Sequence, residues 1–309
     1  MKPMKPMHPS ITIENLAERE RAYSPSSCIG GNYQPFIADY GHQSQLARAR
    51  AEALGGRWLE LRYGSAAAQR ADLCLPPAVT DSAATSEQGC ALLVFIHGGY
   101  WQELAARDSL FAAADCIERG VAFCALDYTL APAAQVGDIV QECRQALLAL
   151  VAQAAALGID AQRIVVAGSS AGAHLAAMVC LPGWQTPTQP LWQPRAAVLM
   201  SGVYWLEPLL GTSINEALGM DAAQARAQSP ALLDLQGFPP TLLCWGEVET
   251  EAFKAQSTEF AALLAQAGST CQSMEIAGRN HFDVALELTR PHSPIGRHTL
   301  ALLTQLDAG

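Results

Sequence analysis

A serine between two glycines is the first feature of the sequence that could do chemistry. Gly168-Ser169-Ser170-Ala171-Gly172 fits the pattern G-x-S-x-G, whose central serine acts as a nucleophile toward a carbonyl carbon. An apolar strand-like run precedes these residues and an alanine-rich helical run follows, and the glycines would let the two approach closely. A plain Gly/Ser turn with Ser170 as the helix N-cap would give the same five residues. The pattern therefore indicates catalysis only if the sequence also offers a base and an acid for the serine.

A serine hydroxyl needs a base within hydrogen-bond reach, and His281 is the candidate. His281 lies in AGRNHFD, after the last predicted strand, which fits the chain order serine, acid, histidine. The run TLLCWGEVETEAF between Ser170 and His281 offers three acids: Glu247, Glu249 and Glu251. Glu249 is best placed in the loop after the strand, whereas Glu251 could belong to the first turn of the next helix, where acids are favoured. We predict Glu249 as the acid, with the choice among the three left open.

A glycine-rich loop, HGGYW at 97–101, follows the apolar run ALLVFI. Small residues there would leave backbone N–H groups free to point at the oxygen of an attacked carbonyl. We predict that the N–H of Ala171 donates to that oxygen, together with one or two of those of Gly98, Gly99 and Tyr100. A plain glycine turn after a strand would have the same sequence.

Three ring side chains near these motifs have less specific assignments. His97 is expected to orient the loop by hydrogen bonding rather than to act as the base. Trp101 and Tyr204 could enclose an aromatic leaving group or could simply pack in the core. The chemistry needs no metal and no organic cofactor, and neither is expected.

The elements that must position these residues alternate along the chain. Apolar strand-like runs are separated by helical runs of 10 to 20 residues, a pattern typical of βαβ units and a mostly parallel sheet. The main runs predicted as strands are 91–99, 121–128, 163–170, RAAVLMSG, PPTLLCWGE and STCQSMEIAG. Two short runs at 57–75 indicate an antiparallel start to the same sheet.

We predict one domain over residues 1–309, because neither a linker nor a second core is visible in the sequence. Residues 1–50 are polar and rich in turn residues, and are expected to form an N-terminal arm or part of a lid. Residues 184–195 and 204–235 interrupt the alternation and are candidate cap or pocket-wall insertions on the catalytic face.

The composition excludes several classes of function. Half of the residues are hydrophobic, 16% are charged, and the net charge is −10 with a pI near 5.1, so nothing favours nucleic acid or anionic lipid. Nine single cysteines without a CxxC pair indicate a reducing compartment. With neither an apolar signal core nor a run of 18 apolar residues, a cytoplasmic location without membrane insertion is expected. The expected partner is a small molecule, and a homodimer stays open.

Taken together, these motifs resemble those of a known family. The HGGYW block, GSSAGAH, Asp127-Tyr128 followed by Leu130-Ala131-Pro132, and NHF resemble the esterase and lipase branch of the α/β-hydrolases. The HGG-x-W form is closer to kynurenine formamidase (arylformamidase) and its bacterial relatives. Other stretches agree, among them SGVYWLEPL at 201–209 and TSINEALGM at 212–220.

The resemblance implies an α/β-hydrolase fold, with an eight-stranded, mostly parallel sheet and helices on both faces. It implies hydrolysis of an N-formyl arylamine or a related small ester or amide, without metal, by Ser170, Glu249 and His281. The acid is more often Asp in that family, so the glutamates here are a departure. A general carboxylesterase of the same fold shares every motif, and a catalytically inactive binding protein is the rival from another class.

Overall fold

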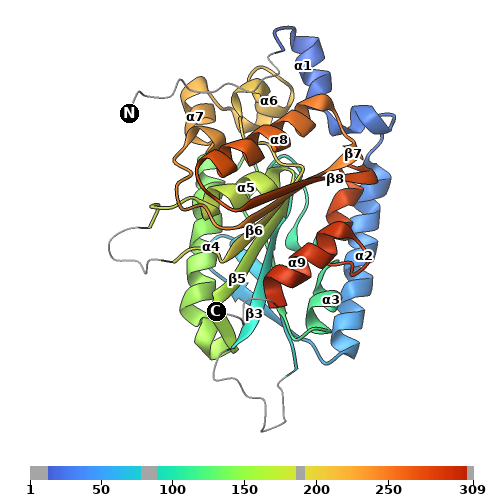
Figure 1. Cartoon of the computed structure of the whole chain (residues 1–309), viewed down its shortest axis with the longest axis vertical. Coiled ribbons are helices and arrows are strands. Elements are labelled where there is room, and N and C mark those ends of the chain that lie inside the picture. The colour runs from blue at the N-terminus through green and yellow to red at the C-terminus, as the bar shows by residue number, and fades with distance from the viewer. Residues whose placement is uncertain (1–12, 78–88, 186–191, 305–309) are drawn as a thin grey trace.

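The computed structural model of the protein describes residues 13–77, 89–185 and 192–304. Its centre is an eight-stranded sheet with the order β1-β2-β4-β3-β5-β6-β7-β8 (Figure 1). Strand β2 runs antiparallel to β1 and β4, and all other neighbours are parallel. The strands are β1 (Arg57–Arg62), β2 (Arg70–Leu75), β3 (Cys90–Ile96), β4 (Ala122–Leu126), β5 (Ile159–Ser169), β6 (Ala196–Met200), β7 (Thr241–Val248) and β8 (Cys271–Asn280). The predicted mostly parallel sheet with an antiparallel start is confirmed.

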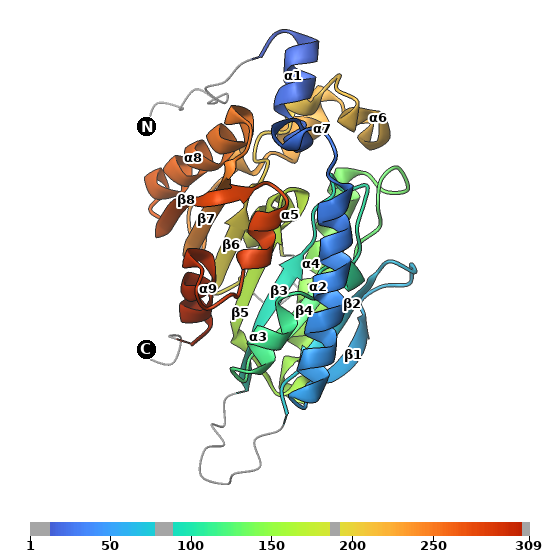
Figure 2. The same cartoon turned by 90° about the vertical axis from the view of Figure 1, so that its right-hand side faces the viewer.

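Helices cover both faces of this sheet, as Figures 1 and 2 show. The helices are α1 (Leu16–Ala22), α2 (Gln34–Ala53), α3 (Ala113–Ile117), α4 (Val136–Leu157), α5 (Ala171–Cys180), α6 (Ile214–Leu218), α7 (Ala222–Ala227), α8 (Glu251–Gln266) and α9 (Pro294–Thr304). Helices α4, α5 and α8 share one apolar core with the sheet, and α2, α3 and α9 share the other. The predicted α/β-hydrolase architecture is therefore confirmed.

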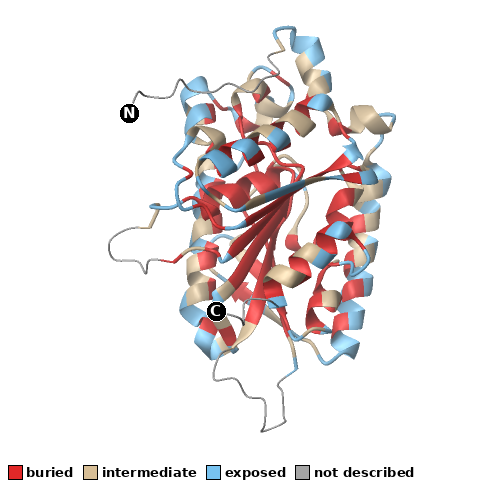
Figure 3. Ribbon diagram, in the orientation of Figure 1, coloured by how far each residue is buried: buried red, intermediate tan, exposed pale blue. Residues whose placement is uncertain are grey.

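The central strands are apolar throughout because both of their faces are covered. Along β3, Leu92, Val94 and Ile96 join the core on the α4 side, while Leu93 and Phe95 join the core on the α2 side. Figure 3 shows these strands as the buried centre of the molecule. Two-sided burial explains why the strand runs show no alternation of polar and apolar residues.

Helix α2 differs from the expected N-terminal arm. Its buried residues Tyr40, Ser44, Ala47 and Ala51 recur at helical spacing and pack on the sheet side of the helix. The Ser44 hydroxyl accepts a hydrogen bond from the Leu110 N–H at 2.9 Å. Because this face consists of one tyrosine, one serine and two alanines, it lacks the strong apolar periodicity that would predict a helix. Within the described residues, only 13–33 have the character of an arm.

The two candidate insertions lie at opposite ends of the parallel strands. Residues 204–235 follow β6 and form α6, α7 and two short 3₁₀ helices beyond the carboxyl ends of the strands, beside α1 (Figures 1 and 2). Residues 184–195 precede β6 and must return to its amino end, since β5 and β6 are parallel. Accordingly Trp192 Nε1 donates to the carbonyl of Ala161, near the start of β5, at 2.7 Å. The described residues of this second segment are thus away from the catalytic face, contrary to expectation; residues 186–191 lie outside the described residues.

In the described parts of the chain, no helix has both the length and the apolar character needed to cross a membrane.

Candidate active site

Ser170 occupies a sharp turn between β5 and α5. Its backbone has φ 56° and ψ −122°, a conformation that L side chains adopt at a cost. A Cβ atom at Gly168 would overlap the carbonyl of Gly172, and one at Gly172 would overlap the carbonyl of Ile96. Glycine at both positions is therefore required by close backbone approach, and the turn sets Ser170 at the amino end of α5.

Ser170, His281 and Glu249 form one hydrogen-bonded chain. His281 Nε2 lies 2.9 Å from Ser170 Oγ, and His281 Nδ1 lies 2.9 Å from Glu249 Oε2. All three are buried, with exposed fractions of 8%, 4% and 6% for Ser170, His281 and Glu249. Each residue follows the carboxyl end of its own parallel strand, β5, β8 or β7, so the sheet brings together positions far apart in sequence.

The structure distinguishes the three glutamates after the seventh strand. Glu249 Oε1 accepts the N–H of Gly246 at 2.6 Å and the hydroxyl of Ser201. Glu247 is exposed and accepts the N–H of Gly278 at 2.7 Å. Glu251 is exposed at the first position of α8. Of the three glutamates, Glu249 is the one in contact with the His281 imidazole.

Ser201 is a member of this network that the sequence did not single out. It follows the end of β6 and has φ 51°, and its hydroxyl reaches the Glu249 carboxylate from the adjacent strand. With the Gly246 amide, it gives Glu249 Oε1 two donors, which fixes the carboxylate and leaves Oε2 for the imidazole. A serine directly after an apolar strand beside the elbow strand is the signal that could have found it.

The 97–101 loop lies against Ser170. A Cβ atom on Gly98 would come within 3.1 Å of Ser170 Cβ, and Gly99 has φ 86°, so both positions require glycine. Among the described residues, no acceptor takes up the backbone N–H of Gly98, Gly99 or Ala171. Three unpaired amide donors thus lie around the serine, as an oxyanion site requires.

Tyrosine hydroxyl groups hold this loop from two sides. The Tyr128 hydroxyl donates to the carbonyls of His97 and Gly98 at 2.9 and 3.2 Å, and its ring stacks on His97 at 4.2 Å. The Tyr100 hydroxyl donates to the carbonyl of Tyr23 at 2.6 Å, which ties the loop to the arm. Burial lowers the pKa of His97, and its Nδ1 lies 3.0 Å from the Gly98 carbonyl. His97 therefore orients the loop through its contact with the Gly98 carbonyl.

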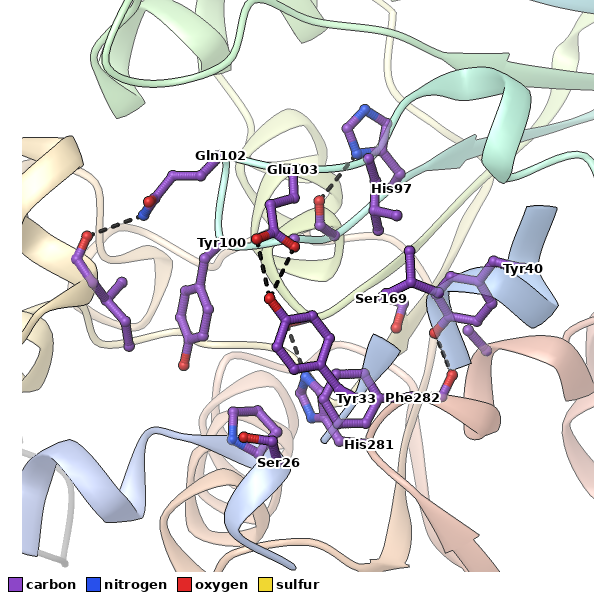
Figure 4. Close-up of a pocket in the computed structure, with 18 of the residues that line it drawn as sticks. Ser26, Tyr33, Tyr40, His97, Tyr100, Gln102, Glu103, Ser169, His281 and Phe282 are labelled. Carbon is purple, nitrogen blue, oxygen red and sulfur yellow. Dashed lines mark hydrogen bonds between the residues drawn. The ribbon is translucent and has the colours of Figure 1, made fainter. Parts of the chain in front are cut away.

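A cavity of about 350 Å³ opens onto Ser170 and His281 (Figure 4). The arm, α2, the 97–104 loop, α6 and the loop after β8 all contribute to its wall. The aromatic lining residues are Tyr23, Tyr33, Tyr40, Phe95, Tyr100, Phe111 and Phe282. This volume lies at the small end of the range for ligand pockets, which suits a small aromatic ligand.

Trp101 and Tyr204 occupy the core and do not line this cavity. Trp101 is 0% exposed and meets the His174 ring edge-on at 5.0 Å. Tyr204 is also 0% exposed and stacks on Phe260 at 4.1 Å. The aromatic wall comes instead from residues such as Tyr33 and Phe282, which stack at 5.5 Å. Phe282 directly follows His281 in the sequence, which is the one local signal for this wall.

His174, one turn after Ser170 on α5, should make stability depend on pH. Its Nε2 lies 2.7 Å from the Gln228 carbonyl, while its buried Nδ1 has no partner among the described residues. A second proton on Nδ1 would be unpaired, so burial lowers the pKa of His174 from 6.5 to about 4. The unfolded chain therefore takes up this proton as pH falls below about 6.5, and the folded protein does not until the pH nears its own lower pKa.

We expect stability to be lost over that window. Between about pH 7 and about pH 5, His174 should lower the free energy of unfolding by about 2 kcal/mol. In His174→Gln the amide can still donate to the Gln228 carbonyl, but the titrating group is gone. Urea unfolding at both pH values measures the change: the stability gap between the two proteins should shrink by that amount at the lower pH. An unchanged gap would mean that His174 is already protonated, or accessible to solvent, in the folded protein.

Comparison with known proteins assigns this fold to a family. A family model of the alpha/beta hydrolase fold matches residues 93–284, so the chain belongs to that family. Kynurenine formamidase from Danio rerio is 29% identical over 245 residues, covering 77% of this chain and 79% of the relative. A solved structure from a Silicibacter species, assigned as a thioesterase, has a TM-score of 0.72 and 29% identity, covering 92% of this chain and 97% of that one.

A thermophilic esterase from Thermogutta terrifontis, solved with propionate bound, is a further neighbour. Its TM-score is 0.60 with 26% identity, covering 79% of this chain and 91% of that one. The protein is therefore a hydrolase of the α/β-hydrolase fold.

Proposed function

We propose that the protein is a serine hydrolase that cleaves a small aryl formamide such as N-formylkynurenine through a formyl-enzyme on Ser170. The observation that carries the proposal is the unbroken chain from Glu249 through His281 to Ser170, opening on an aromatic-lined cavity. The similarity to kynurenine formamidase supports this substrate class.

The first half of the reaction makes the formyl-enzyme. Ser170 Oγ attacks the formyl carbon, and its proton passes to His281 Nε2, 2.9 Å away. The negative charge that develops on the formyl oxygen is stabilised by the N–H groups of Gly98, Gly99 and Ala171. His281 then gives its proton to the aryl nitrogen as the carbon–nitrogen bond breaks, and the free arylamine leaves.

The second half restores the enzyme with water. A water molecule takes the place of the arylamine, loses a proton to His281 and attacks the formyl carbon. The carbon–oxygen bond to Ser170 breaks, Ser170 regains its proton from His281, and formate leaves. Glu249 holds the Nδ1 proton in both halves and stabilises the imidazolium, because Ser201 and Gly246 keep its carboxylate in place.

A formamide suits this cavity because its formyl carbon carries only a hydrogen atom and needs almost no space for an acyl chain. Nearly all of the 350 Å³ is then available to the arylamine. Tyr33 and Phe282 stack face to face beside His281, which must protonate that leaving group. Aromatic faces next to the proton donor favour an aromatic leaving group over an aliphatic one.

A short-chain carboxylesterase is the second candidate. Ile37, Phe95, Leu104 and Phe111 give the cavity apolar lining that could take up an acyl chain longer than formyl. The similarity to the propionate-bound esterase favours the same function.

Substrate comparison tests the two candidates. We expect the purified protein to hydrolyse N-formylkynurenine with a kcat/KM above its values for p-nitrophenyl acetate and p-nitrophenyl butyrate. The absorbance of the released arylamine and of p-nitrophenol gives the rates, and the Ser170→Ala protein gives the background. Rapid ester hydrolysis without formamide cleavage would reject the formamidase and leave the esterase.

A further inference from the structure

The charged side chains that line the cavity next to Ser170 are all acidic among the described residues. Glu20 and Glu103 line it, whereas neither Lys nor Arg does so among the described residues. Neither carboxylate is in an ion pair with a described residue: Glu20 accepts hydrogen bonds from Ser213, and Glu103 from Tyr33. An anionic substrate would therefore meet repulsion without a compensating cation, and a cationic one would find an unpaired charge.

The Tyr33–Glu103 pair lies on the His281 side of this cavity. The Tyr33 hydroxyl donates to both Glu103 carboxylate oxygens, at 3.1 and 3.3 Å. The Tyr33 ring stacks on Phe282 with an interplanar angle of 8°, and Phe282 meets the His281 ring edge-on at 5.4 Å. Figure 4 shows the Tyr33 hydroxyl pointing toward the Glu103 carboxylate. Burial and the charge of Glu103 both raise the pKa of Tyr33, so the hydroxyl remains a donor.

The position of Glu103 indicates which part of the substrate, the leaving group, its carboxylate would contact. His281 must donate its proton to the leaving group, so the leaving group occupies the side of the cavity next to the imidazole. Glu103, Tyr33 and Tyr100 all line this cavity. A carboxylate beside aromatic faces is the arrangement that binds an ammonium group.

We propose that Glu103, oriented by Tyr33, selects substrates whose aromatic leaving group carries an ammonium group. The inference deepens the proposed function and rests on it. It names the class of substrate as aryl formamides or esters with a cationic amine side chain. A carboxylate on the same side chain adds nothing to binding, because no basic residue in the described cavity wall receives it.

Matched aryl acetates test the charge preference without requiring a formamide. The three esters are the acetates of tyramine, of para-propylphenol and of para-hydroxyphenylpropionate, which have similar shape and differ in charge. We expect kcat/KM to be highest for the tyramine ester and lowest for the anionic ester. Because the Glu103 carboxylate is exposed to solvent in the free protein, the ratio of tyramine ester to propylphenol ester in Glu103→Gln should fall by about two- to fivefold, mainly through KM.

Two further variants separate specificity from damage to the fold. Tyr33→Phe keeps the ring but frees the carboxylate, so the same ratio should fall by a smaller factor than in Glu103→Gln. Glu52→Gln removes an exposed carboxylate that pairs with Arg48 outside the cavity, and should leave the ratio as in the wild type. A wild-type protein that hydrolyses the cationic and anionic esters equally well, or a Glu103→Gln ratio equal to the wild-type ratio, would overturn the inference.

The outcome is distinguishable from that of the proposed function. If the esters show the charge preference while N-formylkynurenine is not cleaved, the leaving-group assignment holds and the formamidase function fails. If N-formylkynurenine is cleaved while the ester ratio ignores Glu103, the formamidase function holds and the present inference fails.

Discussion

Ser170→Ala is expected to lower kcat by a factor of about 10⁴–10⁶ while leaving the fold intact. The substitution removes only the hydroxyl, and alanine tolerates the φ of 56° at the turn about as well as serine does. What survives is binding in the cavity and the amide donors of the 97–101 loop, which cannot form an acyl-enzyme. Initial rates with N-formylkynurenine and p-nitrophenyl acetate measure the loss, and circular dichroism reports the fold.

Labelling by a fluorophosphonate gives the same prediction a covalent readout. The wild-type protein should be labelled at Ser170, and the Ser170→Ala protein should not be labelled. Ser273→Ala, an exposed position on the outer strand β8, is the matched control and should be labelled as the wild type is. If the wild type resists the probe and Ser170→Ala changes no rate, the chain is better described as a binding protein with a hydrolase fold.

The positions of Ser170 and His281 could be predicted because the local sequence constrains them strongly. Glycines at 168 and 172 are needed for the crossing of strand and helix, and an apolar run before them marks a strand buried on both faces. The chain order of the strands then requires that a histidine after the last strand reach the same edge of the sheet. These are properties of neighbouring residues and of a common topology.

The acid was harder to assign because side-chain direction after β7 depends on an irregularity. The pairing of β7 with β8 shifts register between Gly246 and Val248, so alternation along the strand no longer predicts where Glu247 and Glu249 point. The direction of the Trp101 side chain is also hard to predict, because the backbone at both Tyr100 and Trp101 has positive φ. As a result, Tyr100 lines the cavity whereas Trp101 lies in the core.

The cavity wall could not be predicted, because its residues meet only in the folded chain. Tyr33 and Tyr40 come from the arm and α2, Glu103 from the 97–104 loop, and Phe282 from the loop after β8. The buried face of α2 carries one tyrosine, one serine and two alanines, whereas a stripe of large apolar side chains would predict a helix. Until α2 is placed on the sheet, no pattern in the sequence indicates that its first turns line the same cavity as Ser170.

Substituting glutamine for each of the three glutamates after β7 should lower kcat strongly at one position and hardly at all at the other two. Glu249→Gln is expected to lower kcat by a factor of about 10³–10⁴. The Ser201 hydroxyl and the Gly246 amide both donate to Oε1, so the glutamine oxygen should take that place and its NH₂ group should face His281 Nδ1. The imidazole would then carry its proton on Nε2 and could no longer accept the proton of Ser170.

Glu247→Gln and Glu251→Gln are the controls, because both side chains are exposed and neither contacts the imidazole. Their rates should stay within about twofold of the wild type, as expected for surface charges. The kcat of each variant, measured with N-formylkynurenine and with p-nitrophenyl acetate, decides the assignment. A loss confined to Glu247→Gln or Glu251→Gln would require the loop after β7 to rearrange when substrate binds. A loss confined to Glu249→Gln would identify the acid by function, because the three variants make the same change of charge and only Glu249 contacts His281.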